Sequence, residues 1–215
     1  LRRPMVWMVM AASSLVLWLM VMLIDPGKGV TLNWQDWFFS SGMHVGLLFQ
    51  IGRQNWELIA ALMTLHVVFL FTSGAKQEFG RDFIPWILEA LEIAFTFLVL
   101  TAADLWSLIL AWTTMDAFLF TYWSFFRKKA ATEEIYRGFV FKFIGSILLI
   151  YNTAQISGRG GSLLLTSLPA ANSALVLLAA LLHGGLFPLY IFENRKIDHQ
   201  TVLDFLSLCL PFLSS

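Results

Sequence analysis

Long apolar segments separated by short breaks constrain most strongly what this chain can fold into. Six of them cover residues 5–24, 56–74, 83–101, 105–126, 135–156 and about 171–192, and a further one starts at 201–215. Each complete segment is close to the ~20 residues that a helix needs to cross a bilayer. Because lipid offers no hydrogen-bond partner to an open backbone, each segment is expected to be helical. The sequence predicts an all-α, polytopic integral membrane protein with about six to seven transmembrane helices.

Composition agrees with a chain that is surrounded by lipid. Charged residues make up 13% of the sequence and hydrophobic residues 58%, whereas soluble domains carry roughly 25% charged residues. The formal net charge is zero, which argues against nucleic acid as a partner. A single cysteine, Cys209, excludes an internal disulfide.

Residues 25–55 interrupt the helical pattern. Asp25, Pro26 and Gly27 end the first segment with turn chemistry, and the stretch that follows is rich in Trp and partly alternating. We interpret it as an extracytoplasmic loop or hairpin.

Basic residues predict which way the chain crosses the membrane, because they favour the cytoplasmic side. With a cytoplasmic N-terminus, the residues that fall inside are Arg2, Arg3, Lys76, Arg81, Arg127, Lys128, Lys129, Arg137, Arg195 and Lys196. Those that fall outside are Lys28, Arg53 and Arg159. We therefore expect a cytoplasmic N-terminus, with a bacterial inner membrane as the location.

Two glutamates lie in the first half of the third segment. A charged side chain at the bilayer centre costs at least ~2.5–3.5 kcal/mol, so ionisable residues within an apolar segment require an explanation. Glu89 and Glu92 are three residues apart on one helical face. They form a proton-relay or ion-coordinating pair, or else they lie at the cytoplasmic interface and pair with Lys76, Arg81 or Arg127.

Asp116 lies more centrally in the fourth segment. Thr113 and Thr114 precede it, and Lys142 on the next segment is a candidate partner. A buried Asp–Lys pair of this kind serves transport in a transporter and serves structure elsewhere, and the residues alone leave both interpretations open.

His183 lies beside residues that break helices, namely Gly184, Gly185 and Pro188. A helix broken near an ionisable residue is typical of ion pathways. The alternatives are a hydrogen bond from the imidazole to a freed carbonyl and axial ligation of a tetrapyrrole by the neutral ring. His66, in the middle of the second segment, is interpreted as a core histidine, or as the pigment ligand if a pigment binds.

Motifs of free-standing enzymes are missing from the sequence. It contains no nucleophile elbow, phosphate-binding loop, Cys/His metal cluster or dinucleotide-binding turn. We therefore expect no catalytic site, metal or cofactor of its own, with bound lipid, quinone or pigment at a complex interface left open.

Three stretches resemble the antiporter-like membrane subunits of respiratory complex I and of multisubunit cation/proton antiporters. Residues 102–112 (AADLWSLILAW) look like the family run that ends in Trp before a glutamate, and 141–151 with Gly145 is similar to the next family helix. Residues 183–190 (HGGLFPLY) look like the family segment that begins with a lysine and continues to Phe-Pro-Leu-His. The resemblance covers about residues 5–200. It implies that the chain begins near the family's second helix and ends before its second inverted repeat.

The resemblance also defines where this chain departs from the family. The glutamate position is Thr113, the lysine position is His183, and the family's WLPDA ending is replaced by residues 191–194 (IFEN). In the family, that glutamate and lysine form a charge pair whose approach drives proton movement. The resemblance implies that His183 takes the basic role here, with Asp116, Glu89 or Glu92 in place of the carboxylate. Lys142 lies on the helix that often bears a basic residue.

Two main functions follow as hypotheses. The first is a proton- or cation-translocating membrane subunit of a larger energy-converting complex. The second is an accessory or structural subunit of a respiratory or photosynthetic, pigment-binding complex that has lost pumping. In both, the partners are other transmembrane subunits and the bilayer. A stand-alone transporter is the third alternative.

Overall fold

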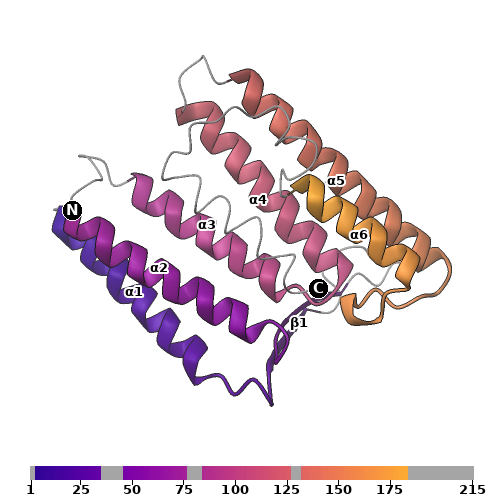
Figure 1. Cartoon of the computed structure of the whole chain (residues 1–215), viewed down its shortest axis with the longest axis horizontal. Coiled ribbons are helices and arrows are strands. Elements are labelled where there is room, and N and C mark those ends of the chain that lie inside the picture. The colour runs from indigo at the N-terminus through magenta and orange to yellow at the C-terminus, as the bar shows by residue number, and fades with distance from the viewer. Residues whose placement is uncertain (1–2, 35–45, 77–83, 127–131, 184–215) are drawn as a thin grey trace. The chain divides into compact units, whose positions relative to one another are not determined.

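The computed structural model of the chain is mostly helical (Figure 1). It describes residues 3–34, 46–76, 84–126 and 132–183. The helices in these ranges are α1 (Arg3–Leu23), α2 (Trp56–Lys76), α3 (Ile84–Thr101), α4 (Leu105–Phe126), α5 (Thr132–Gly158), the short 3-10 helix η2 (Leu165–Ser167) and α6 (Ala170–His183). Strands β1 (Val30–Trp34) and β2 (Leu47–Ile51) pair in a two-stranded sheet.

The α-helices coincide closely with the six apolar segments of the sequence, apart from the end of the last one. Residues 184–192, which include Gly184, Gly185 and Pro188, lie outside the described residues, and so does the segment at 201–215. The predicted helix break and seventh helix therefore stay predictions. β1 and β2 occupy the segment that we interpreted as a loop or hairpin.

Length and hydropathy alone support fewer membrane spans than we expected. Among the described residues, one helical stretch, Gly138–Gly158, is long and apolar enough to cross a bilayer. Five others are apolar but shorter: Trp7–Leu23, Trp56–Thr72, Ala90–Thr101, Leu105–Thr121 and Ala170–His183. The count of six to seven spans therefore stays a prediction.

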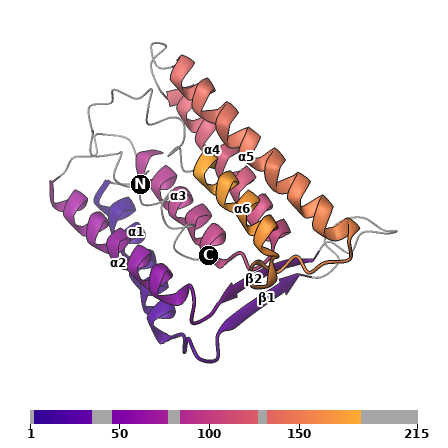
Figure 2. The ribbon, with the colours of Figure 1, turned by 45° about the vertical axis from the view of Figure 1, so that its right-hand side comes forward.

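The chain divides into two compact units, and the first comprises Leu1–Thr31 and Gln50–Thr101. Within it, α1 and α2 lie side by side (Figures 1 and 2). Three tryptophan indoles donate hydrogen bonds of 2.9 Å between these helices: Trp7 to the Leu70 carbonyl, Trp18 to Thr64 Oγ1, and Trp56 to the Val21 carbonyl. The same helix pair buries a hydrogen bond between Ser14 Oγ and His66 Nε2.

The second unit comprises Leu32–Phe49 and Ala102–Ser215, and in it α5 packs against both α4 and α6 (Figure 2). A reciprocal amide pair fastens α5 to α6. Asn152 Nδ2 donates to the backbone carbonyl of Asn172 at 3.1 Å, and Asn172 Nδ2 donates to Asn152 Oδ1. Both side chains are buried, so their amide groups depend on each other for hydrogen bonds.

Asp104, which precedes α4, joins three backbone segments of the second unit. Its Oδ1 accepts a hydrogen bond from the Ser107 amide at 2.7 Å, as an N-cap does. Its Oδ2 accepts the Leu48 amide at 2.8 Å, and its backbone forms an antiparallel bridge with Leu164. Burial raises the pKa of the Asp104 carboxyl, and the hydrogen bonds from Ser107 and Leu48 partly oppose that rise.

Candidate functional site

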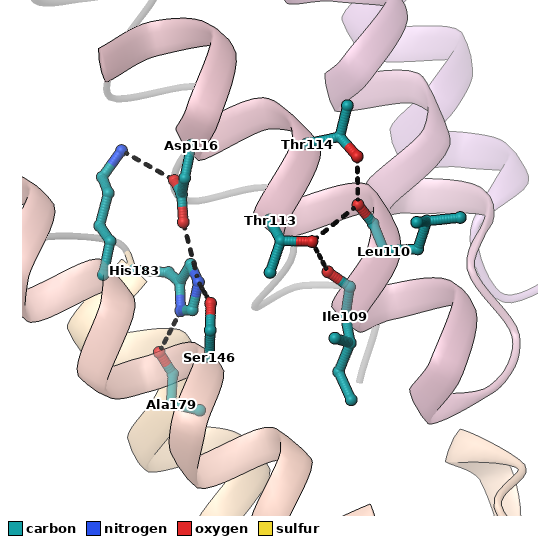
Figure 3. A network of polar contacts seen from close by, with 9 residues as sticks. Ile109, Leu110, Thr113, Thr114, Asp116, Ser146, Ala179 and His183 are labelled. Atoms are coloured by element: carbon teal, nitrogen blue, oxygen red, sulfur yellow. Dashed lines mark hydrogen bonds and ion pairs between the residues drawn. The ribbon is translucent and has the colours of Figure 1, made fainter. Parts of the chain in front are cut away.

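A cluster of ionisable side chains in the second unit brings together three residues that the sequence singled out (Figure 3). Asp116 comes from α4, Lys142 from α5, and His183 is the last residue of α6. Lys142 Nζ lies 3.3 Å from Asp116 Oδ1, and His183 Nε2 lies 3.1 Å from Asp116 Oδ2. One carboxylate therefore contacts two bases, one at each oxygen.

The three side chains of the cluster are largely shielded from solvent, which strengthens the electrostatic interactions between them. Asp116 is 5% exposed and His183 is 2% exposed, while the Lys142 side chain is 19% exposed. Removing one member of such a buried pair leaves an uncompensated charge in the interior. The contacts among the three groups are therefore electrostatic interactions in surroundings that hold little water.

The hydrogen bonds of His183 determine where its protons lie. Nδ1 is 3.0 Å from the Ala179 carbonyl one turn earlier in α6. A carbonyl oxygen only accepts, so Nδ1 carries a hydrogen and donates it. Nε2, the nitrogen that remains, faces Asp116 Oδ2 and, at 3.3 Å, Ser146 Oγ. Both ring nitrogens thus contact protein groups of the second unit.

Three further residues shape the surroundings of the His183 ring, and the sequence did not single them out as site residues. The Trp112 indole stacks on the imidazole with ring centroids 4.5 Å apart and an interplanar angle of 17°. Ser146 supplies the hydroxyl beside Nε2, and Gly145 lies against the ring edge. Gly145 and Trp112 were noticed only as parts of the resembling stretches. Gly145 and Ser146 are small residues three and four positions after Lys142, and small residues at such spacing are typical of helix–helix contacts in membranes. That spacing was the signal that could have indicated both residues.

Thr113, which occupies the family's glutamate position, does not join the cluster. Its hydroxyl donates back to its own helix, 2.7 Å from the Ile109 carbonyl and 3.2 Å from the Leu110 carbonyl. Thr114 also bonds to the Leu110 carbonyl. In Figure 3 both hydroxyls face these carbonyls and not Asp116. Among the described residues, the carboxylate that contacts His183 is that of Asp116, about one helical turn further along α4.

The other ionisable candidates, His66, Glu89 and Glu92, lie in the first unit. His66 and Glu92 belong to α2 and α3, and His66 is buried against Ser14. The side chain of Glu89 lies outside the described residues. In the part of the chain that the structure describes, no group of three or more His, Cys, Asp or Glu side chains could hold a metal ion.

Comparisons with known proteins bear on the fold. No protein-family model matches the sequence, and no curated protein does. A solved structure of the membrane-bound sulfane sulfur reductase, an archaeal respiratory membrane complex, contains a chain with a similar fold. The TM-score is 0.64 at 16% sequence identity, and the match covers 94% of this chain and 35% of that chain. The protein therefore shares its fold with about a third of that longer chain.

Proposed function

We propose that this chain is an integral membrane subunit of an energy-converting complex and that Asp116, Lys142 and His183 form its proton- or cation-transfer site. The observation that carries the proposal is one buried carboxylate between two bases on three different helices. A proton added to or removed from any member changes the electrostatic energy of the other two. Such mutual dependence is what a transfer site requires.

The depth of the cluster supports this role. Asp116 lies about 17 Å from the first residue of α4 and about 15 Å from the last, at a rise of 1.5 Å per residue. In a bilayer with a hydrocarbon core ~30 Å thick, that is close to the centre. Ionisable residues at that depth are costly, and they commonly mark proton relays and ion pathways.

The two faces of α5 support a lipid environment. The inward face carries polar or ionisable groups, namely Lys142 beside α4, Ser146 and Asn152 beside α6, and the buried Thr153. The opposite face exposes large apolar side chains, namely Val140, Phe143, Ile147 and Ile150. Water would favour the reverse distribution, whereas lipid favours apolar side chains outside and polar groups between helices.

The likeness to a chain of an archaeal respiratory membrane complex supports the assignment to an energy-converting complex. Purification of the full-length tagged chain from its own membranes in mild detergent tests that part. Co-purifying flavin and iron–sulfur subunits are the expected result. A homo-oligomer that brings down no other subunit would contradict it.

Single substitutions test the transfer site. We expect Asp116→Asn and His183→Gln each to abolish ion-linked proton uptake by membrane vesicles when uptake is measured per assembled complex. His66→Gln, a buried histidine of the first unit, is the matched control and retains uptake. Normal uptake in both site variants with normal assembly would sink the proposal.

A second function, that of an accessory subunit which has kept the fold without pumping, is favoured by Thr113. Its hydroxyl is bonded to helix carbonyls and cannot carry the family's charge. Under this function, Asp116→Asn and His183→Gln alter assembly or stability and leave proton uptake by the complex intact. The vesicle experiment therefore separates the two functions.

A further inference from the structure

Close approach of α5 and α6 determines where the His183 ring sits. A Cβ atom added to Gly145 would lie 2.5 Å from His183 Nδ1, 2.7 Å from its Cε1 and 3.1 Å from the Ala179 carbonyl oxygen. Real Cβ atoms do not approach neighbours to 2.5 Å. The ring cannot simply withdraw, since Trp112 is stacked on it. Any side chain at residue 145 would therefore force His183 out of its present position.

The position that Gly145 permits limits the ring to one neutral tautomer. In it, Nδ1–H donates to the Ala179 carbonyl while Nε2 faces Asp116 and Ser146. A ring rotated by 180° would lose the hydrogen bond from Nδ1–H to the Ala179 carbonyl, and it would also turn Nε2 away from Asp116 and Ser146. Nδ1 therefore keeps its hydrogen, and Nε2 is the nitrogen that gains or loses one.

We propose that Gly145 is a positioning residue of the site, which holds His183 so that proton exchange takes place at Nε2 and not at Nδ1. This inference rests on the proposed transfer function. It adds that the geometry of exchange is determined by a residue with no ionisable group.

The exchange step is balanced within the cluster. When the proton on Nε2 of the imidazolium moves to Asp116 Oδ2, the N–H bond breaks and an O–H bond forms, and the electron pair stays on Nε2. A neutral imidazole and a neutral carboxylic acid result, with Nδ1–H still bonded to Ala179. Nε2 can then accept the hydroxyl hydrogen of Ser146. Both protonation states thus have hydrogen-bond partners without rotation of the ring.

Trp112 adds a preference within the same geometry. An imidazolium stacked on an indole face gains a cation–π attraction that the neutral ring lacks. The Ser146 hydroxyl can accept a hydrogen bond from Nε2–H or donate one to a bare Nε2. Lys142, on α5, contributes a further charge beside the carboxylate.

Nitrogen NMR of the full-length chain in lipid bilayers tests the proposal, with ¹⁵N-labelled histidine and His183→Gln to assign the signal. We expect wild-type His183 to be found as imidazolium and as the Nδ1–H tautomer. Gly145→Ala should bring in the Nε2–H tautomer, which the free ring prefers. The matched control is Gly138→Ala on the same helix, where an added Cβ meets nothing within 4 Å and the gain in helix propensity is equal. It should keep the wild-type pattern.

Proton uptake supplies the second measurement. A displacement of about 1 Å at a reacting group lowers rates on the order of 100-fold, so Gly145→Ala should lose uptake to that extent and Gly138→Ala should not. An Nε2–H tautomer in the wild type, or an unchanged tautomer in Gly145→Ala, would overturn the proposal. If Gly145→Ala does not fold, the tautomer seen in the wild-type spectrum decides whether the proposal stands. Failure of uptake in the wild type, with the tautomer change present, would reject the transfer function and leave the positioning role standing.

Discussion

Each unit of the protein buries a histidine that contacts a serine on a neighbouring helix, and at His183 a carboxylate contacts the same ring nitrogen. His66 Nε2 lies 3.0 Å from Ser14 Oγ; Ile59, Met63 and Leu70 are buried on the same face of α2. His183 Nε2 lies 3.3 Å from Ser146 Oγ but also 3.1 Å from Asp116 Oδ2. The carboxylate beside Nε2 gives the imidazole of His183 a group with which it could exchange a proton. The comparison predicts that substitutions at the two sites differ in kind as well as in size.

The largest expected effect is at Asp116, because Lys142 and His183 both contact its carboxylate. We expect Asp116→Leu to lower the free energy of unfolding by about 3–5 kcal/mol, since it leaves buried bases without a counter-charge. Replacing all three members, as Asp116→Leu, Lys142→Met and His183→Leu together, should recover most of that loss. Reversible unfolding in mixed micelles measures both. A triple variant as unstable as Asp116→Leu would show that packing, and not charge, causes the loss.

A smaller loss is expected where α5 and α6 are joined without charges. Asn152→Ala removes two hydrogen bonds to Asn172 and leaves a buried amide group without that partner. The expected cost is about 2 kcal/mol. Proton uptake per folded complex should stay at the wild-type level, which separates destabilisation from loss of transfer. Reduced uptake in Asn152→Ala at equal folded protein would contradict this separation.

The first unit offers a milder test. Ser14→Ala removes the hydroxyl beside His66, and we expect a loss of about 1 kcal/mol in the free energy of unfolding. Its neighbour Ser13 is exposed and bonds to the Met10 carbonyl within its own helix, so Ser13→Ala should change stability by less than about 0.5 kcal/mol. Equal losses in both variants, or lower proton uptake in Ser14→Ala, would remove the distinction between the two histidine sites.

Helix positions followed from the sequence because the apolar segments and their Gly, Pro and charged breaks are local signals. Part of the site followed too, since ionisable residues inside apolar segments are conspicuous: Asp116, Lys142 and His183 were singled out from their surroundings. The contacts of Trp112, Gly145 and Ser146 did not follow, because apolar and small residues are common in such helices. Their role depends on which faces of α4, α5 and α6 meet, and that is determined by tertiary packing.

Thr113 illustrates the same limit. The resemblance drew attention to that position because a glutamate is expected there, but a threonine in a helix can satisfy its hydroxyl on the preceding turn. The structure has that local bond. Asp104 was missed altogether as a buried group, since its partners Leu48 and Leu164 are distant along the chain.

The smallest expected effect is a pH dependence at Asp104, which lies between α3 and α4. Burial raises the pKa of its carboxyl above the ordinary 3.8, so the folded state holds the proton more tightly than the unfolded state does. The stability that this contributes is present below pH 3.8 and is lost as the pH rises through the folded-state pKa. Asp104→Asn keeps an oxygen for the Ser107 amide, and Ser107 Oγ still accepts the Leu48 amide. We expect Asp104→Asn to change the free energy of unfolding by less than about 1 kcal/mol. Its stability relative to the wild type should increase as the pH rises. Thermal unfolding of both proteins across pH measures the difference, and a gap that stays constant or narrows would mean that the hydrogen bonds to the carboxylate outweigh its burial.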